Sequence, residues 1–175
     1  ASEARRAGWE APATAVAPLD AVPLAQLATH ARAAVFVVST HGQGEAPANM
    51  SAFWSFLRRA DLPADSLANL SYAVFGLGDS GYALYNAAAR RLDARLAQLG
   101  ARRLCVAGLG DARHKSGGHE AAFDRWLPTL WRALQASAAL PPRAGKGAAF
   151  PAPQDAIDAA KGTPDALAIR ASAVG

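Results

Sequence analysis

The sequence predicts a doubly wound α/β domain, in which helices cover both faces of a parallel sheet. Three short apolar runs each end in a glycine-containing loop: "AVFVVSTHG" (34–42), "SYAVFGLGD" (71–79) and "RRLCVAGLGD" (102–111). Runs that are apolar throughout, without alternation, are typical of parallel strands buried on both faces. A helical pattern follows each run, and repeated strand–loop–helix units build this fold class. We therefore expect paired strands at residues 35–38, 72–75 and 104–107.

The helices are predicted from apolar spacing and from residues that favour helix ends. Residues 50–57 carry apolar side chains spaced i, i+3, i+4 and i+7, with Asn49 as a plausible N-cap. Residues 88–99 show the same periodicity and end at Gly100, a residue type favoured after helices.

A third helical pattern covers residues 123–134 and contains Pro128. Proline removes a helical hydrogen bond, so this helix should either begin near Asp124 or kink.

The two ends of the chain are expected to differ in order. "PATAVAPLD" (12–20) could be one more strand, and "PLAQLATHA" (23–31) a short helix or irregular connector. Residues 140–175 are rich in Pro, Gly and Ala and poor in large apolar residues, which predicts a disordered linker or tail. We assign residues 1–139 to a single domain. "ASEARRAG" reads as the end of a helix, so we expect the domain to be incomplete at its N-terminus.

Composition excludes several classes of function. Apolar residues make up 51% and charged residues 18% of the chain, as in a globular domain. The longest apolar stretch, residues 33–38, is far too short to span a bilayer, so we expect no membrane partner. The net charge of +4 comes from scattered arginine pairs without interleaved aromatic residues, which argues against nucleic acid. Cys105 is the single cysteine and is predicted to be a small buried strand residue.

Three motifs invite other functions. "GLGDSG" (76–81) matches the G-x-G-x-x-G pattern, but no acidic residue follows about 20 positions later to hold a ribose. A nicotinamide-binding dehydrogenase fragment therefore stays a weak alternative. His114 and His119 with Cys105 fit no usual zinc spacing, so we expect no metal. The sequence has no Ser–His–acid arrangement and no paired carboxylates with a role, which argues against hydrolysis.

Two loops carry most of the information about function: "STHGQGEAP" (39–47) and "LGDSGYALYN" (77–86). In a doubly wound sheet both lie at the carboxyl ends of strands, where ligands bind. The first offers glycines for close backbone approach, and the second offers tyrosines, an asparagine and an aspartate. This combination suits a flat, hydrogen-bonding aromatic ligand.

Longer stretches around these loops resemble the FMN-binding, flavodoxin-like domain of the NADPH-dependent diflavin reductases. The matching text is "THGQGEAPANMSAFWSFL" (40–57), "VFGLGDSGYALYNAAARRLDARLAQLGA" (74–101) and "GLGDARH…FDRWLPTLWRAL" (108–134). The similarity is greatest to the reductase of cytosolic iron–sulfur protein assembly. Relatives such as cytochrome P450 reductase and sulfite reductase flavoprotein usually have Tyr-Gly where this chain has His41 and Gly42.

The resemblance implies a role for each loop. The first loop would border the reactive edge of the flavin, with His41 against one face of the ring and the Gly42 carbonyl near the flavin N5–H. Tyr82 would stack on the other face. The cofactor-binding residues implied in this way are Ser39, Thr40, His41, Gly42, Leu77, Gly78, Asp79, Ser80, Gly81, Tyr82, Ala83, Leu84, Tyr85 and Asn86.

The resemblance also implies a place for the domain in a larger enzyme. Electrons would pass from NADPH through FAD, on a separate reductase domain, to FMN here, and then to an iron–sulfur assembly acceptor protein in the cytoplasm. The chain departs from the family pattern because Asp111 is followed by Ala112 instead of a second acid. The family's first strand and its phosphate loop are also missing, so we expect an empty strand position beside residues 35–38 and an inactive fragment.

Two alternatives to this function remain. One is a flavodoxin-like docking module without FMN. The other is the FMN domain of another diflavin reductase, of the cytochrome P450 reductase or sulfite reductase type.

Overall fold

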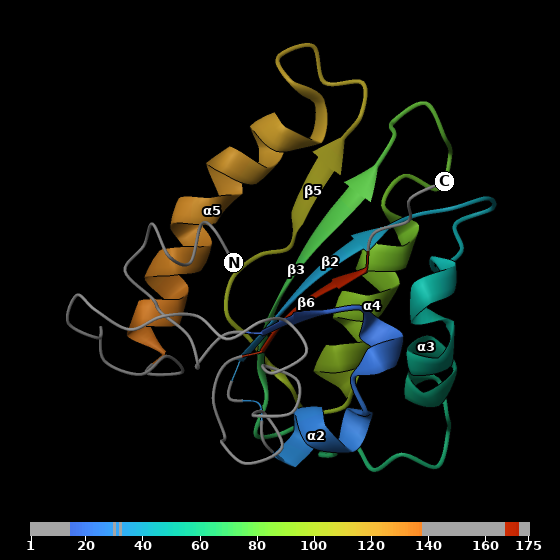
Figure 1. Ribbon diagram of the computed structural model, residues 1–175, viewed down its shortest axis with the longest axis vertical. Coiled ribbons are helices and arrows are strands. Elements are labelled where there is room, and N and C mark those ends of the chain that lie inside the picture. The colour runs from blue at the N-terminus through green and yellow to red at the C-terminus, as the bar shows by residue number, and fades with distance from the viewer. Residues whose placement is uncertain (1–14, 30, 32, 138–166, 172–175) are drawn as a thin grey trace.

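A parallel sheet with helices on both faces forms the part of the protein that the computed structural model describes, residues 15–29, 31, 33–137 and 167–171 (Figure 1). All pairings between its strands are parallel. The strand order is β1-β6-β2-β3-β4, and β5 also pairs with β3. The bounds are β1 (Ala15–Ala17), β2 (Ala33–Ser39), β3 (Ser71–Gly78), β4 (Arg102–Arg103), β5 (Gly108–Asp111) and β6 (Leu167–Ala171). The predicted α/β fold class is confirmed.

The helices cover the two faces of the sheet unequally. One face carries most of the core, including Phe36, Leu57 and Leu92, under three helices. The other face packs Phe75 and Trp126 under a single long helix. The three helices are α2 (Leu24–Thr29), α3 (Ser51–Leu57) and α4 (Ala87–Gln98), and the single one is α5 (Gly118–Ala136). Among the described residues, none of the helices has the length and apolar character needed to cross a membrane.

Two helix predictions are confirmed in part. Helix α4 follows the expected apolar face and ends just before Gly100, whose φ of +84° favours glycine. Helix α5 begins at Gly118 and contains Pro128, so the expected start near Asp124 is wrong.

The prediction that Asn49 caps α3 is also wrong. A short 3-10 helix, η2 (Ala48–Met50), leads into α3, and Met50 occupies the N-cap position without a side-chain bond. The carboxylate of Asp20 instead accepts hydrogen bonds from the backbone N–H groups of Ala52 (3.3 Å) and Phe53 (2.9 Å). A carboxylate is favoured there because the first N–H groups of a helix lack helical partners. Asp20 lies in the 3-10 helix η1 (Leu19–Ala21), 33 residues away from Phe53 in sequence.

The third predicted strand, residues 104–107, is interrupted. β4 ends at Arg103 and β5 begins at Gly108, so residues 104–107 connect two short strands along the same edge of β3. The side chain of Val106 is 82% exposed, and its carbonyl accepts the indole N–H of Trp126 at 2.9 Å. The chain leaves the ladder to make this bond with α5. Cys105 is half-buried in the connection and not in a strand, and burial raises the pKa of its thiol.

The expectation of an empty strand position beside β2 is wrong. β6 occupies it and pairs on one side with β1 and on the other with β2, in the register Val35↔Ala168 and Val37↔Arg170. Unpaired backbone groups in the middle of a sheet are costly, and a five-residue strand is enough to satisfy them. Residues 167–171 therefore belong to the sheet, which corrects the predicted tail at these positions. The rest of the predicted linker or tail, residues 140–166 and 172–175, lies outside the described residues.

Candidate functional site

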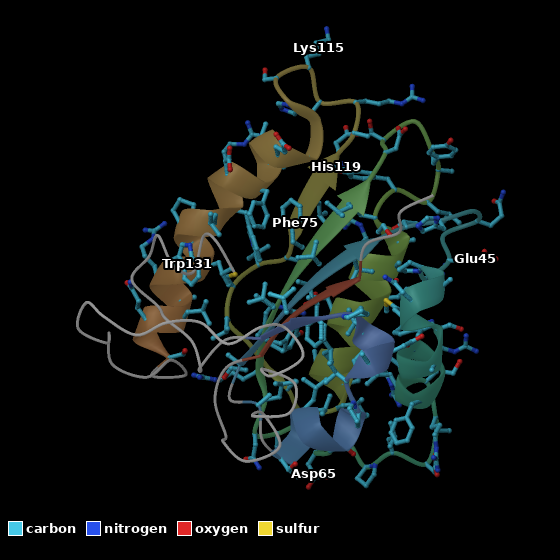
Figure 2. All side chains as sticks on the ribbon, in the orientation of Figure 1. Glu45, Asp65, Phe75, Lys115, His119 and Trp131 are labelled. Carbon is cyan, nitrogen blue, oxygen red and sulfur yellow. The ribbon has the colours of Figure 1, made fainter. Side chains whose placement is uncertain are left out.

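Three loops leave the carboxyl ends of neighbouring strands at one edge of the sheet. Loop 1 (39–47) follows β2, loop 2 (78–86) follows β3, and loop 3 (111–118) follows β5. Figure 2 shows Glu45 on loop 1 and Lys115 on loop 3 away from Asp65, which lies at the opposite end of the sheet. Loops 1 and 2, which the sequence singled out, lie at the same edge as predicted, because β2 and β3 pair in parallel with Ser39 beside Leu77.

Loop 1 is a tight hairpin whose tip is Gly42 and Gln43. The backbone of His41 donates to the Glu45 carbonyl at 3.0 Å, and the Glu45 N–H donates back to His41 at 2.8 Å. Gly44 also donates to the His41 carbonyl, at 3.0 Å. Both glycines have positive φ, +46° at Gly42 and +84° at Gly44, a backbone conformation that explains the two glycines of the motif. The His41 side chain is exposed, and its Nε2 lies 3.1 Å from the Ser39 hydroxyl.

Loop 1 is anchored to loop 2 and to the start of α4. The Thr40 N–H donates to the Leu77 carbonyl at 3.2 Å, and its hydroxyl oxygen accepts the Ala88 N–H at 3.3 Å. The N-cap residue of α4, Asn86, makes no side-chain hydrogen bond to the start of the helix. Thr40 supplies a partner to this first turn instead. Gly44 is buried against loop 2, because a Cβ at this position would come within 2.9 Å of Leu84 Cδ1. The two loops therefore form a single surface.

Loop 2 exposes two large side chains on that surface. Tyr82 is 66% exposed and Leu84 is 40% exposed. The backbone at this point is fixed by Asp79, whose carboxylate accepts the Gly81 N–H at 2.7 Å and whose carbonyl accepts the Tyr82 N–H at 3.1 Å. Burial of an aromatic ring usually stabilises a protein or a complex strongly, and the Tyr82 ring is mostly exposed. It therefore presents an apolar face that a planar partner could cover.

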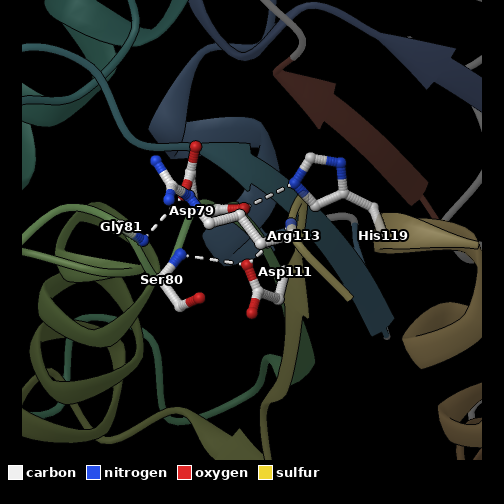
Figure 3. Close-up of polar contacts among 7 residues, drawn as sticks. Asp79, Ser80, Gly81, Asp111, Arg113 and His119 are labelled. Carbon is white, nitrogen blue, oxygen red and sulfur yellow. Dashed lines mark hydrogen bonds and ion pairs between the residues drawn. The ribbon is translucent and has the colours of Figure 1, made fainter. Parts of the chain in front are cut away.

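Loop 3 holds the tip of loop 2 in place (Figure 3). Oδ1 of Asp111 accepts the backbone N–H groups of Ser80 (2.9 Å) and Arg113 (3.0 Å). These bonds, that of Ser80 first, lower the pKa of the Asp111 carboxyl. The Nε–H of Arg113 donates to Asp79 at 2.6 Å, and its guanidinium lies over Gly81, where a Cβ would come within 2.2 Å.

The start of loop 2 is held by His119 of α5. The carbonyl of Gly78 accepts the Nε2–H of His119 at 2.7 Å and the backbone N–H of Ala112 at 2.8 Å. His119 thus donates a structural hydrogen bond that links the start of α5 to the start of loop 2. The described residues contain no group of three or more His, Cys, Asp or Glu side chains that could hold a metal.

The side chain of Asn86 packs against Gly76 and Gly78, the first two glycines of the G-x-G-x-x-G match. Its side chain is fully buried and donates to the Gly110 carbonyl at 2.9 Å, and its φ of +55° is unusual for a residue other than glycine. A Cβ on Gly76 would come within 2.3 Å of Asn86 Oδ1, and one on Gly78 within 2.7 Å of its Cγ. These glycines make room for Asn86 and not for a pyrophosphate. Moreover, α4 begins only at Ala87, well after Gly81.

The predicted site residues fall into three groups by exposure. The exposed ones line the shared surface of the loops: His41, Gly42, Ser80, Gly81, Tyr82, Ala83 and Leu84. The half-buried ones support it: Ser39, Thr40, Leu77, Asp79 and Tyr85. Gly78 and Asn86 are buried. The hydroxyl of Tyr85 donates to the Leu109 carbonyl at 3.2 Å, and burial is the main cause that raises its pKa.

The contributions of Asp111, Arg113 and His119 were not predicted from the sequence. Asp111 and Arg113 lie in loop 3 and His119 lies at the start of α5, and neither segment carries a repeated motif. The acidic residue that ends the strand, Asp111, is the one signal that could have indicated a partner for loop 2.

Comparison with known proteins places this arrangement in a family. The flavodoxin family model matches residues 1–126. The chain is 47% identical over 132 residues to NADPH-dependent diflavin oxidoreductase 1 of Arabidopsis thaliana, which is 75% of this chain and 20% of that protein. The protein of the same name from Danio rerio is 48% identical over 111 residues, 63% of this chain and 18% of that protein.

A solved structure agrees on the fold. The Streptococcus pneumonia TIGR4 flavodoxin is 25% identical, with a TM-score of 0.51 over 69% of this chain and 74% of that one. The chain spans about a fifth of the length of the curated diflavin relatives that it matches. The chain belongs to the flavodoxin family.

Proposed function

We propose that the chain is the FMN-binding, electron-transferring domain of an NADPH-dependent diflavin reductase. The observation that carries the proposal is the pairing of loops 1 and 2 at the carboxyl edge. There an exposed Tyr82 ring lies on the loop that packs, through Leu84, against the loop 1 hairpin. A flat aromatic ring that also forms hydrogen bonds at its edge would use both a stacking face and closely approaching main chain.

The residues present fit the ring of FMN. Gly42 at the hairpin tip has positive φ and an exposed backbone, so its peptide can approach a ring edge without a side chain in the way. Asp111 of loop 3 and Asp79 within loop 2 fix the loop 2 backbone next to Tyr82, so the stacking face is oriented before a ligand arrives. Such preorganisation reduces the entropy cost of binding. FMN, when bound, supplies the electron chemistry.

The partners follow from the proposed function. A reductase domain carrying FAD and NADPH would supply the electrons, and an iron–sulfur assembly protein in the cytoplasm would accept them. The similarity to the two named diflavin oxidoreductases supports this reading. The nicotinamide-binding alternative loses its support because Asn86 fills the space at Gly76 and Gly78. Two alternatives remain as outcomes of experiment: a docking module without FMN, and the FMN domain of another diflavin reductase.

A stacking variant tests the proposal. Tyr82→Ala should weaken FMN binding by about one to two orders of magnitude, because the stacking and burial of an aromatic ring contribute on the order of 1–3 kcal/mol. The measurement is a titration that follows the quenching of FMN fluorescence. Arg58→Ala is the control, because Arg58 is exposed at the end of α3, and it should leave the affinity unchanged. Equal FMN affinity in the parent chain and Tyr82→Ala would contradict the role of Tyr82.

A further inference from the structure

Arg91 of α4 connects that helix to the base of loop 1. Its Nη1 donates to the carbonyl of Gly44 at 2.8 Å, in a partly buried contact 47 residues apart in sequence. We propose that Arg91 is a positioning residue that fixes the base of the loop 1 hairpin, so that backbone movement is confined to its tip, Gly42 and Gln43. The expected effect of Arg91 on the reduction of bound FMN rests on the proposed function. The expected effect on the hydrogen bonds within loop 1 does not.

The base of the hairpin is held from several directions. Within the loop, His41 and Glu45 exchange backbone hydrogen bonds. Outside it, the Thr40 hydroxyl accepts from the first turn of α4, one turn before Arg91 on the same helix. The neighbouring Gly44 is packed against Leu84 with no room for a Cβ. Arg91 adds a charge-assisted bond, which is about twice as strong as a neutral one.

The tip of the hairpin has no such restraint. Gly42 and Gln43 are exposed, and neither makes a hydrogen bond with the described residues. A Cβ on Gly42 would meet the end of the flexible Glu45 side chain, at 3.0 Å, and no backbone atom. The peptide between Gly42 and Gln43 can therefore rotate without breaking these bonds, whereas the His41 carbonyl and the Gly44 N–H on either side are bonded to each other. Arg91 holds the Gly44 end of this segment in place.

Arg90 provides a matched control on the same helix. The Arg90 side chain is exposed and makes no hydrogen bond or ion pair with the described residues. Arg90→Met replaces the same side chain and removes the same charge as Arg91→Met, one position away. A difference between the two variants reports the bond to Gly44 and not the change in net charge.

Amide hydrogen exchange without any cofactor is the first test. Arg91→Met should speed exchange of the His41 and Glu45 amides by about tenfold, since losing a hydrogen bond of about 1.4 kcal/mol changes local opening by that factor. Arg91→Lys should restore most of the protection because an ammonium group can also donate to the carbonyl. Arg90→Met should match the parent. Equal exchange in Arg91→Met and Arg90→Met would overturn the proposal, as would faster exchange spread evenly over the whole sheet.

The reduction of bound FMN is the second test. With the base loosened, we expect the separation between the two one-electron midpoint potentials to change in Arg91→Met and to return toward the parent value in Arg91→Lys. If amide exchange is faster but the two midpoint potentials are unchanged, Arg91 does not influence the reduction of bound FMN. If the parent chain binds no FMN, the proposed function fails, and the exchange experiment still decides whether Arg91 positions loop 1.

Discussion

The phenolic hydroxyl of Tyr72, on strand β3, donates to the carboxylate of Asp93 on α4 at 3.0 Å. It also lies 2.9 Å from the Asp93 backbone carbonyl. Tyr72 is fully buried, and Arg103 of β4 binds the same carboxylate through two bonds of 2.8 and 2.7 Å. Burial first, and then the neighbouring Asp93, raise the pKa of Tyr72 to about 12. This network joins the sheet to α4 at the end away from the site.

The raised pKa of Tyr72 predicts a loss of stability in alkaline solution. The folded protein keeps the phenol protonated between its unfolded pKa of about 10 and its folded pKa, so stability is complete below about pH 10 and falls as pH rises toward 12. The loss should reach about 2–3 kcal/mol at most. Urea unfolding at several pH values measures it. Tyr72→Phe should flatten this part of the profile, and a slope equal to that of the parent would contradict the assignment.

Gly44 predicts a large effect from a single methyl group. Its φ of +84° is disfavoured for alanine, and the added Cβ would meet Leu84 Cδ1 at 2.9 Å. We expect Gly44→Ala to destabilise the protein by about 1–3 kcal/mol in urea unfolding. Gly42→Ala should cost less because its Cβ would meet only the end of the Glu45 side chain. Equal losses in the two variants would contradict the packing of Gly44 against loop 2.

The position of β6 predicts that the end of the chain stabilises the sheet. A chain that stops after residue 166 lacks the strand between β1 and β2 and leaves both with unpaired backbone groups. We expect a lower melting temperature and concentration-dependent aggregation, measured by calorimetry and light scattering. A chain that stops after residue 171 keeps β6 and should behave as the parent. If the shorter chain is as stable and as monomeric as the longer one, β6 does not complete the sheet.

The sequence predicts those parts of the fold whose signal is local. The run around Phe36 is apolar without alternation and becomes β2, and the apolar spacing before Gly100 becomes α4. The two glycine loops meet as expected because parallel strands end at one edge of a sheet. Tyr82 is exposed at that edge, although its contact with FMN stays a prediction.

The features that sequence reasoning missed depend on distant partners. Asp20 serves α3 across 33 residues, and Asp111 serves loop 2 across 31, so no local pattern marks either residue as a cap. The strand β6 is five residues long in a segment poor in large apolar side chains, and its position is decided by the open edges of β1 and β2. The break at residues 104–107 depends on where the indole of Trp126 lies.

Chemical-shift mapping can show whether a flat aromatic ring binds between loops 1 and 2. FMN is titrated into the isotope-labelled chain, with NADPH as the comparison ligand. We expect the amides of Gly42, Gln43 and Tyr82 to shift most with FMN, and the amide of Asp65, at the opposite end of the sheet, to stay unchanged (Figure 2). NADPH should leave all four amides unchanged. Saturable shifts centred elsewhere, or no shifts with millimolar FMN, would show that the ring does not bind between these loops.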